Sequence, residues 1–352
     1  MEIIKNNTST KLFDGERDRI MRLDTSPYLT ETKEDGIIPI GQNIWNAQLA
    51  NTWFTDEVNL TEDVYDFNNK LTPPELRGFK LALGFASNLD GIQTDNLPIN
   101  IMPIIKETWF RMCISRQTME EALHCTQYLK MVDTFELDRE EIYNLFQSDE
   151  VMYGKNNHII EVYDGLASKP TTEDKILACF ANLALEHIYF YSVFLFFGNL
   201  QKLGKMKETA KAIRFIARDE ATTHTELFAS FIKIAKDEYP EEYARALPKA
   251  IEMFKEATEL EINWGKYIIK DGILGLSEVT IEKFVKSLAD EAFRKINEEV
   301  IYGEENPFKW FNDWLDFNST NERFFEGTVM NYAKGESGAD KSTKSSFLSR
   351  FN

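Results

Sequence analysis

Acidic residues and histidines recur in two groups whose types suit metal binding. Each group is an acid followed downstream by a Glu/His pair, and the members are Asp90 with Glu121 and His124, and Glu186 with Glu220 and His224. Each of the two leading acids lies among apolar residues that prefer the interior. An unpaired buried carboxylate is costly, and metal coordination is one of the few ways to keep several of them charged together. Four acids and two imidazoles therefore predict a site for two metal ions, with iron or manganese suited to these ligands.

The spacing within the two groups matches a known ligand set with two departures. Ferritin-like di-iron and di-manganese proteins use one Glu from each of two helices and Glu-x-x-His from two others. Asp90 replaces one Glu, which shortens the ligand by a methylene and leaves its chemistry unchanged. His224 follows Glu220 by four residues rather than three, and one extra residue turns the side chain by about 100° around a helix. Either a one-residue π-bulge lies between Glu220 and His224 or the second metal is held differently, and we favour the bulge because such bulges are frequent at functional sites.

Four apolar segments with helical character position these side chains. The sequence Thr72-Pro-Pro-Glu75 combines a capping box with proline in the first turn, and it begins the helix that carries Asp90. Residues 171–174 are a second N-terminal signal, for the helix of Glu186, and Gly198 is a natural place for that helix to end. The other two segments are 106–135, with Glu121 and His124, and 205–236, with Glu220 and His224, and further helices are expected over 241–270 and 276–300.

Length and composition predict one large helical domain with two appended segments. The chain has 352 residues, 43% of them hydrophobic, and long helical patterns without strand alternation. We expect an all-α, ferritin-like helical bundle with additional helices and the di-metal site in its core. The predicted organisation is an N-terminal arm over 1–40, the helical domain over 41–318 and a flexible C-terminal tail over 319–352. Within that tail, residues 334–346 contain no apolar side chain larger than alanine and cannot pack.

Net charge, cysteine spacing and the apolar segments limit the expected partners and cellular location of the protein. A net charge of −18 opposes binding along a phosphate backbone, so nucleic acid is not expected as a partner. The three cysteines form no Cys-x-x-Cys arrangement and fit a reducing cytosol. The N-terminus lacks an apolar signal core, which predicts a cytoplasmic protein. The apolar run 176–197 is interrupted by Asn182, Glu186 and His187, so it is expected to be a buried helix and not a membrane span.

Several residues near the predicted ligands have two possible roles. Tyr128 follows His124 by one helical turn, so its ring should lie close to the site, although a core tyrosine is the default interpretation. Phe190, Phe194 and Ile216 lie near Glu186 or Glu220 along the chain. They could form a dry wall around the tyrosine, but sequence alone favours ordinary core residues.

Four segments resemble the small, radical-generating subunit of class I ribonucleotide reductase, namely 89–93, 121–128, 185–191 and 216–220. The similarity spans Trp53 to the C-terminus. It implies that the two groups of acids and histidines are the metal ligands. It also implies that Tyr128 is oxidised to a stable radical when the reduced metals react with oxygen, and that Phe190, Phe194 and Ile216 form the apolar pocket around that radical.

The same resemblance implies a relay and a partner. Asp219 would link Trp53 by hydrogen bonds to the ligand His124, and Tyr332 with Glu326 would pass the radical to the large subunit. The resemblance also implies a homodimer that docks to the large subunit through its C-terminal peptide, by the apolar residues Phe347, Leu348 and Phe351. From the residues alone, Trp53 is a core tryptophan, Tyr332 is an exposed tail residue, and the tail tip is as readily a frayed end as an anchor.

The predicted function is therefore the small subunit of ribonucleoside-diphosphate reductase, which supports deoxyribonucleotide biosynthesis for DNA replication. The chain has no glycine-rich phosphate loop and no cysteine pair, so reduction of the ribonucleotide must occur in another chain. The alternative is a ferritin-like di-metal oxidase or oxygenase acting on a small organic substrate, which would need an open cavity and no tail relay. Two iron ions are the preferred cofactor, with di-manganese and a flavoprotein activator as the alternative.

Overall fold

Capping side chains begin two of the helices that carry the predicted ligands. The Thr72 hydroxyl accepts a hydrogen bond from the backbone N–H of Glu75, and the Glu75 carboxylate accepts one from the backbone N–H of Thr72 at 2.8 Å. Thr171 and Asp174 form the same reciprocal pair at the start of a second helix. Both capping interactions predicted from the sequence are confirmed.

The structure, a computed structural model, describes residues 11–13, 36–164 and 170–316. Within these ranges the chain is helical and contains no strand. The α-helices are α2 (Ile38–Ala50), α3 (Val64–Asn69), α4 (Pro73–Asn96), α5 (Thr108–Thr134), α6 (Arg139–Tyr143), α7 (Leu145–Ser148), α8 (Glu150–Asp164), α9 (Thr172–Ala184), α10 (Tyr191–Lys202), α11 (Lys207–Asp219), α12 (Thr225–Glu238), α13 (Pro240–Ile269), α14 (Glu278–Lys295) and α15 (Lys309–Leu315). Two 3-10 turns, η1 (Thr55–Glu57) and η2 (Leu60–Asp63), precede α3, and three π-helical turns are η3 (Leu97–Ile101), η4 (Leu185–Tyr189) and η5 (Glu220–His224).

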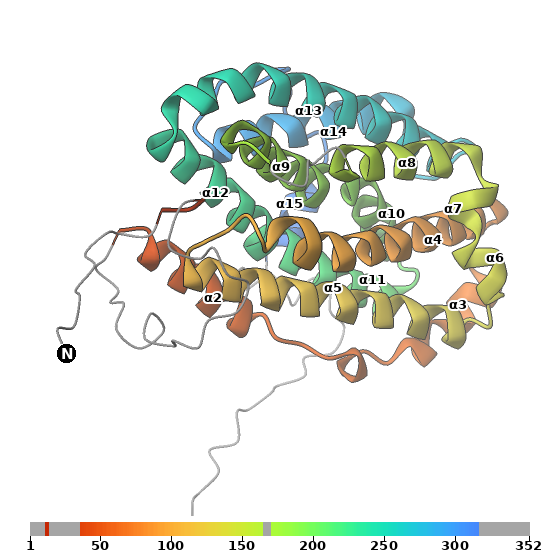
Figure 1. Ribbon diagram of the computed structural model, residues 1–352. Coiled ribbons are helices and arrows are strands. Elements are labelled where there is room, and N and C mark those ends of the chain that lie inside the picture. The colour runs from red at the N-terminus through yellow and green to blue at the C-terminus, as the bar shows by residue number, and fades with distance from the viewer. Residues whose placement is uncertain (1–10, 14–35, 165–169, 317–352) are drawn as a thin grey trace, which may run out of the picture. The chain divides into compact units, whose positions relative to one another are not determined.

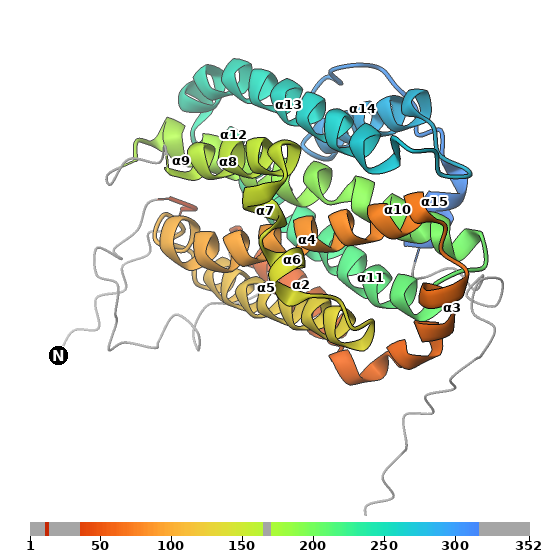
Figure 2. The same ribbon diagram turned by 90° about the vertical axis from the view of Figure 1, so that its right-hand side faces the viewer.

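Four long helical rods form the bundle that surrounds the predicted site. Two of the rods are α4 and α5, which lie side by side (Figures 1 and 2). The other two are interrupted by π-turns: α9 continues through η4 into α10, and α11 continues through η5 into α12. Helix α10 packs against α11, and α9 packs against α12. The all-α, ferritin-like bundle predicted from the sequence is confirmed.

Additional helices cover the bundle on two sides. Helix α2 packs on α5, while α13 packs on α9 and α14 (Figure 2). Helix α2 begins at Ile38, inside the last residues of the predicted arm. Of that arm the structure describes residues 11–13, where Leu12 and Phe13 are buried and the Leu12 N–H donates to Glu238 Oε2 at 2.9 Å. The predicted boundary near residue 318 lies outside the described residues.

The helix that follows η4 does not end at Gly198, so that sequence prediction is wrong. Helix α10 continues to Lys202, and Gly204, with a φ of +76°, supplies the left-handed residue after its end. Gly198 lies inside the helix, where an added Cβ would meet the rings of Trp310 and Trp314 at 3.4 Å. The missing side chain therefore serves close packing of two tryptophans rather than helix termination.

The most apolar stretch of the described chain lies inside the protein. Residues Thr172–Lys202 are long and apolar enough to cross a membrane by composition, but 94% of the most apolar window is buried. Contacts with α12, α13 and α14 cover this rod on its outer sides. It is the core helix expected from the sequence.

Candidate metal centre

The six predicted ligands meet in the core of the bundle, each fully buried. They come from all four rods: Asp90 from α4, Glu121 and His124 from α5, Glu186 from η4, and Glu220 and His224 from η5. Their ligand atoms fall into two sets, each within 4.8 Å, formed by Asp90, Glu121, His124 and Glu220, and by Glu121, Glu186, Glu220 and His224. Glu121 and Glu220 belong to both sets, so each would contribute to both metal positions.

Unsatisfied polar atoms show that this cluster suits cations. Within the described part of the chain, several buried ligand atoms have no hydrogen-bond partner: both carboxylate oxygens of Asp90, Glu121 Oε2, His124 Nδ1, Glu186 Oε2 and Glu220 Oε1. Buried polar groups are normally hydrogen-bonded, and such a concentration of orphans needs an explanation. Carboxylate oxygens and imidazole nitrogens are ligands for iron and manganese, so the residues present fit a di-metal centre.

The electrostatics of the cluster lead to the same conclusion. Burial raises the pKa of the Asp90 and Glu220 carboxyls well above the usual range, and neighbouring carboxylates, among them Glu121 and Glu186, raise both further. Burial alone would lower the pKa of His224, but the carboxylates of Glu220 and Glu121 outweigh it and raise that pKa. Cations or protons must therefore offset the negative charge, and binding of a metal would release protons.

The four-residue spacing between Glu220 and His224 is absorbed by the π-turn η5, as predicted. The turn spans Glu220–His224 and widens the helix by one residue. His224 Nδ1 then lies 2.9 Å from Glu220 Oε2. The Thr223 hydroxyl donates to the carbonyl of Asp219 at 2.9 Å, which satisfies a backbone acceptor beside the distortion. Because of the π-turn, the His224 side chain points into the cluster of acids. In a regular helix the extra residue would turn it away.

A second π-turn, η4, carries Glu186 and is braced by a buried ion pair. Lys155 from α8 contacts Glu261 of α13, and both side chains are at most 2% exposed. The Lys155 ammonium also donates to the carbonyl of Tyr189 at 3.2 Å, and Glu261 Oε1 accepts from the backbone N–H of Ser192 at 3.0 Å. Tyr189 is the last residue of the π-turn and Ser192 lies in the first turn of α10, so the ion pair supports the segment that presents Glu186.

Amide side chains contact Glu186 from the opposite rods. Gln117 Nε2 of α5 donates to Glu186 Oε1 at 2.7 Å and lies 3.1 Å from Glu121 Oε1. Gln93 of α4 also donates to Glu186 Oε1, and it is held by Asn96 through a hydrogen bond of 2.9 Å. Glu186 therefore keeps one oxygen fixed by amides, while its Oε2 faces the other ligands.

Tyr128 lies beside the predicted ligands in the described core. Its side chain is fully buried, and burial raises the pKa of its phenol well above the ordinary value. The negative charges of Asp90 and Glu220 raise that pKa further. Tyr128 follows His124 by one turn of α5, so both side chains lie on the same face of that helix. Phe190, Phe194 and Ile216, the predicted pocket residues, are fully buried in the same hydrophobic core, and the two phenylalanine rings stack at 5.9 Å.

Hydrogen bonds connect Trp53 to a predicted ligand. Trp53 is 2% exposed, and its indole N–H donates to Asp219 Oδ2 at 2.7 Å. The same oxygen lies 3.3 Å from His124 Nε2. The indole also stacks against the His124 ring at 6.1 Å. These contacts join the predicted relay residues Trp53 and Asp219 to the ligand cluster.

The remaining predicted functional residues lie outside the described residues. They are the tail residues Glu326, Tyr332, Phe347, Leu348 and Phe351. Their roles remain predictions.

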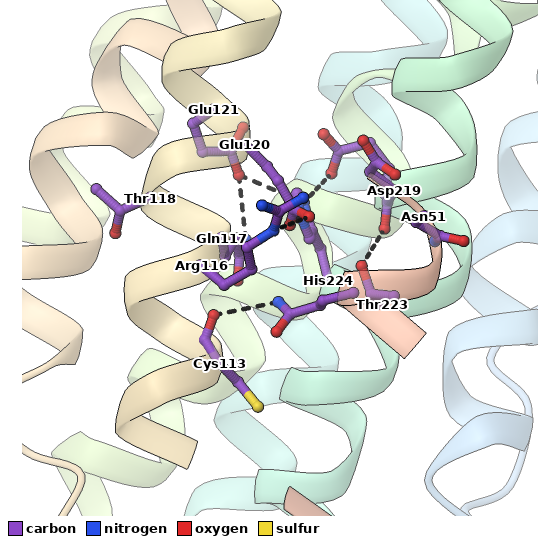
Figure 3. Close-up of polar contacts among 12 residues, drawn as sticks. Asn51, Cys113, Arg116, Gln117, Thr118, Glu120, Glu121, Asp219, Thr223 and His224 are labelled. Carbon is purple, nitrogen blue, oxygen red and sulfur yellow. Dashed lines mark hydrogen bonds and ion pairs between the residues drawn. The ribbon is translucent and has the colours of Figure 1, made fainter. Parts of the chain in front are cut away.

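Sequence reasoning missed several partners of the ligands. Gln93 and Gln117 lie within one helical turn of Asp90 and Glu121, a spacing that could have flagged them. Glu120 and its partner Arg116 carried no such signal, because adjacent residues on a helix face different directions. Figure 3 shows Glu120 beside His224, which comes from a distant part of the chain.

Comparison with known proteins agrees with this geometry. The model of the family "Ribonucleotide reductase, small chain" matches residues 39–307. The ribonucleoside-diphosphate reductase subunit beta of Treponema pallidum is 33% identical over 84% of this chain and 86% of that protein. The corresponding subunit of Halalkalibacterium halodurans is 29% identical over 94% and 93%.

A solved structure has the same fold. The ribonucleotide reductase R2 subunit from Clostridium botulinum superposes with a TM-score of 0.74, at 31% identity, over 78% of this chain and 87% of that one. These likenesses favour the reductase over the oxidase or oxygenase alternative. With its ligand-bearing helical bundle and a family match across most of its length, the chain belongs to the ribonucleotide reductase small chain family and is a subunit of that oxidoreductase.

Proposed function

We propose that this protein is the radical-generating small subunit of a class I ribonucleoside-diphosphate reductase, with Tyr128 as the residue that is oxidised. The observation that carries the proposal is the convergence of six buried ligand side chains beside a buried phenol. The proposed metal ligands are Asp90, Glu121, His124, Glu186, Glu220 and His224. When two metal ions are bound there, their reaction with oxygen supplies the oxidising power that Tyr128 needs.

The surroundings of Tyr128 suit a long-lived radical. Because burial and nearby carboxylates raise its pKa, the phenol stays protonated until it loses an electron and a proton. Phe190, Phe194 and Ile216 are fully buried apolar residues, and we assign them to the wall that keeps water and reductants from the ring. Such side chains offer no proton and no electron at low cost to the radical.

We assign the electron path out of the site to hydrogen-bonded side chains. Trp53 donates to Asp219, which contacts the distal nitrogen of His124, so a continuous path joins a proposed ligand to Trp53, in the segment between α2 and η1. Tyr332 and Glu326 would continue that path to the large subunit, and Phe347, Leu348 and Phe351 would anchor the tail in it.

The family implies a large-subunit partner and a homodimer. We propose two iron ions as the cofactor, with di-manganese and a flavoprotein activator as the alternative, since carboxylate and imidazole ligands accept both metals. We further propose a cytoplasmic location, where reduced thiols persist; the three cysteines are free.

Replacing Tyr128 by phenylalanine tests the proposed radical site. We expect the variant to bind two metal ions as the wild type does and to lose the tyrosyl signal completely, because phenylalanine has no phenolic O–H to oxidise. Electron paramagnetic resonance after addition of Fe(II) and oxygen measures the signal. Tyr191→Phe, at another buried tyrosine of the same core, should keep it. A full signal in Tyr128→Phe would show that the radical resides elsewhere, and oxygen consumption with product formation and no signal in the wild type would support an oxygenase.

Replacing Tyr332 by phenylalanine tests the proposed exit from the subunit. The variant should form the Tyr128 radical in full yield, because the change lies far along the chain from the ligands. Turnover with the large subunit should fall to background, since phenylalanine cannot pass a phenolic electron and proton. Tyr65→Phe, at a side chain that is 66% exposed, serves as control and should turn over normally. Normal turnover in Tyr332→Phe would refute the tail relay.

A further inference from the structure

The two ligand histidines use their ring nitrogens in the same way. In each ring Nδ1 faces the ligand carboxylates, at 3.3 Å from Glu220 Oε1 for His124 and at 2.9 Å from Glu220 Oε2 for His224. The distal nitrogen Nε2 of each ring faces a further carboxylate outside the ligand set. For His124 it is Asp219, at 3.3 Å, and for His224 it is Glu120, at 3.0 Å. The site therefore has two carboxylate–histidine arms.

An arginine holds Glu120 in place. Arg116, one turn earlier on α5, donates from Nε to Glu120 Oε1 at 2.8 Å, which leaves Oε2 for His224. Glu120 is 1% exposed and the Arg116 side chain 13% exposed, so water screens this pair weakly. Arg116 Nη2 then donates to the Thr52 hydroxyl at 3.1 Å. Figure 3 shows Arg116 and Glu120 directed towards the His224 ring.

The two arms end on adjacent residues of one segment. Asp219 lies beside Arg218, with 3.7 Å between Arg218 Nε and Asp219 Oδ1, and it accepts from the indole of Trp53. Arg116 reaches Thr52, the residue before Trp53. Each arm thus consists of a histidine, a buried carboxylate and an arginine. Both arms contact the segment directly after α2, one at Trp53 and the other at Thr52.

Stability alone does not explain a buried Glu120. Buried ion pairs are weak sources of stability, and well-packed apolar residues of similar size often replace them without loss. A carboxylate that accepts the distal N–H of a ligand histidine has a specific effect, because it fixes the ring and the tautomer. At His224 that tautomer leaves the Nδ1 lone pair facing Glu186 and Glu220.

We propose that Glu120, held by Arg116, is a positioning residue for the second metal ion, which His224, Glu186 and Glu220 would bind. It orients His224 and keeps Nδ1 available as the ligand atom. The inference rests on the proposed metal centre and goes beyond it, since it makes the two metal positions separable by mutation. Outer partners of this kind contribute about 10–100-fold to metal affinity.

Titration of the metal-free full-length protein with Mn(II) tests the proposal, with free Mn(II) followed by electron paramagnetic resonance. The wild type should bind two ions per chain. In Glu120→Met one of the two binding steps should weaken by about 10–100-fold while the other stays unchanged. Glu120→Gln keeps an oxygen that can accept the His224 N–H and should recover most of the loss. Asp133→Asn is the matched control, because it removes an arginine partner, Arg139, at the far end of α5 and should bind as the wild type.

Pulsed resonance at the bound Mn(II) supplies a second readout, the nitrogen coupling of the imidazole ligand. The coupling should change in Glu120→Met, whereas mere loss of stability would leave it unaltered. Two unchanged binding steps in Glu120→Met, beside a wild type that binds two ions, would overturn the positioning role and leave the proposed function intact. A wild type that binds fewer than two ions would instead refute the metal centre. If Glu120→Met fails to fold, Arg116→Met, which leaves the carboxylate present but unheld, should weaken the same step, and its unchanged binding would equally overturn the role.

Discussion

Glu220→Ala is expected to abolish both metal binding and the tyrosyl radical. Glu220 is one of two carboxylates whose oxygens lie in both ligand sets, so its loss removes a ligand from each metal position. The affinity should fall by more than about 100-fold, since outer partners of ligands alone contribute about 10–100-fold. Metal content per chain and the resonance signal after Fe(II) and oxygen measure the two effects.

The metal-free Glu220→Ala protein should remain folded, which separates loss of a ligand from loss of structure. Burial and neighbouring carboxylates raise the pKa of Glu220, so the wild-type cluster gains little stability from its charge. Glu226→Ala is the control on the following turn of the same rod, where the side chain is 39% exposed and pairs with Lys233. It should retain both metals and the radical. If Glu220→Ala bound as much metal as the wild type, Glu220 would not be a metal ligand.

Lys155→Met is expected to cause the largest loss of stability among single substitutions considered for this chain. The change leaves the Glu261 carboxylate buried without its cation and the Tyr189 carbonyl without its donor. Removing one partner of a buried ion pair typically costs about 3–5 kcal/mol. Burial lowers the pKa of Lys155 to about 8 and raises that of Glu261, so the pair itself is not strongly favourable, and the cost comes from the charge left behind.

A double variant tests that explanation. In Lys155→Met with Glu261→Gln, the amide oxygen can still accept the Ser192 N–H, and no unpaired charge stays buried. Most of the lost stability should return. Urea denaturation of the metal-free protein at one fixed protein concentration measures the free energy of unfolding, because a dimer's stability depends on concentration. A double variant as unstable as Lys155→Met would show that the contact of the Lys155 ammonium with the Phe85 ring, 4.0 Å from Nζ to the ring centroid, matters more than the charge left on Glu261.

The local sequence was sufficient to predict the four helical segments that carry the proposed ligands. Capping boxes at Thr72 and Thr171 mark the helix starts, because a cap depends on residues within one turn. The ligand pairs were recognisable from their spacing, since one helical turn fixes which side chains share a face. Even the π-turn followed from an extra residue between Glu220 and His224.

Gly198 was a misleading signal for the end of a helix. Gly198 satisfied the local rule for a helix end, yet α10 continues through it to Lys202, and Trp310 and Trp314 pack against that position. The tryptophans lie more than a hundred residues further along the chain. A sequence pattern within one helical turn cannot predict contacts between residues so far apart in the chain.

The sequence by itself determined the types and spacing of the proposed ligands and the helices on which they lie, all of which depend on neighbours along the chain. Only the tertiary structure decided which groups support those ligands. Glu120 meets His224 across 104 positions of sequence, and Lys155 meets Glu261 across 106. Contacts of that range follow from how the rods pack against one another. The roughly 100° between adjacent helical residues is enough to direct Glu121 into the proposed ligand set and Glu120 to the His224 ring.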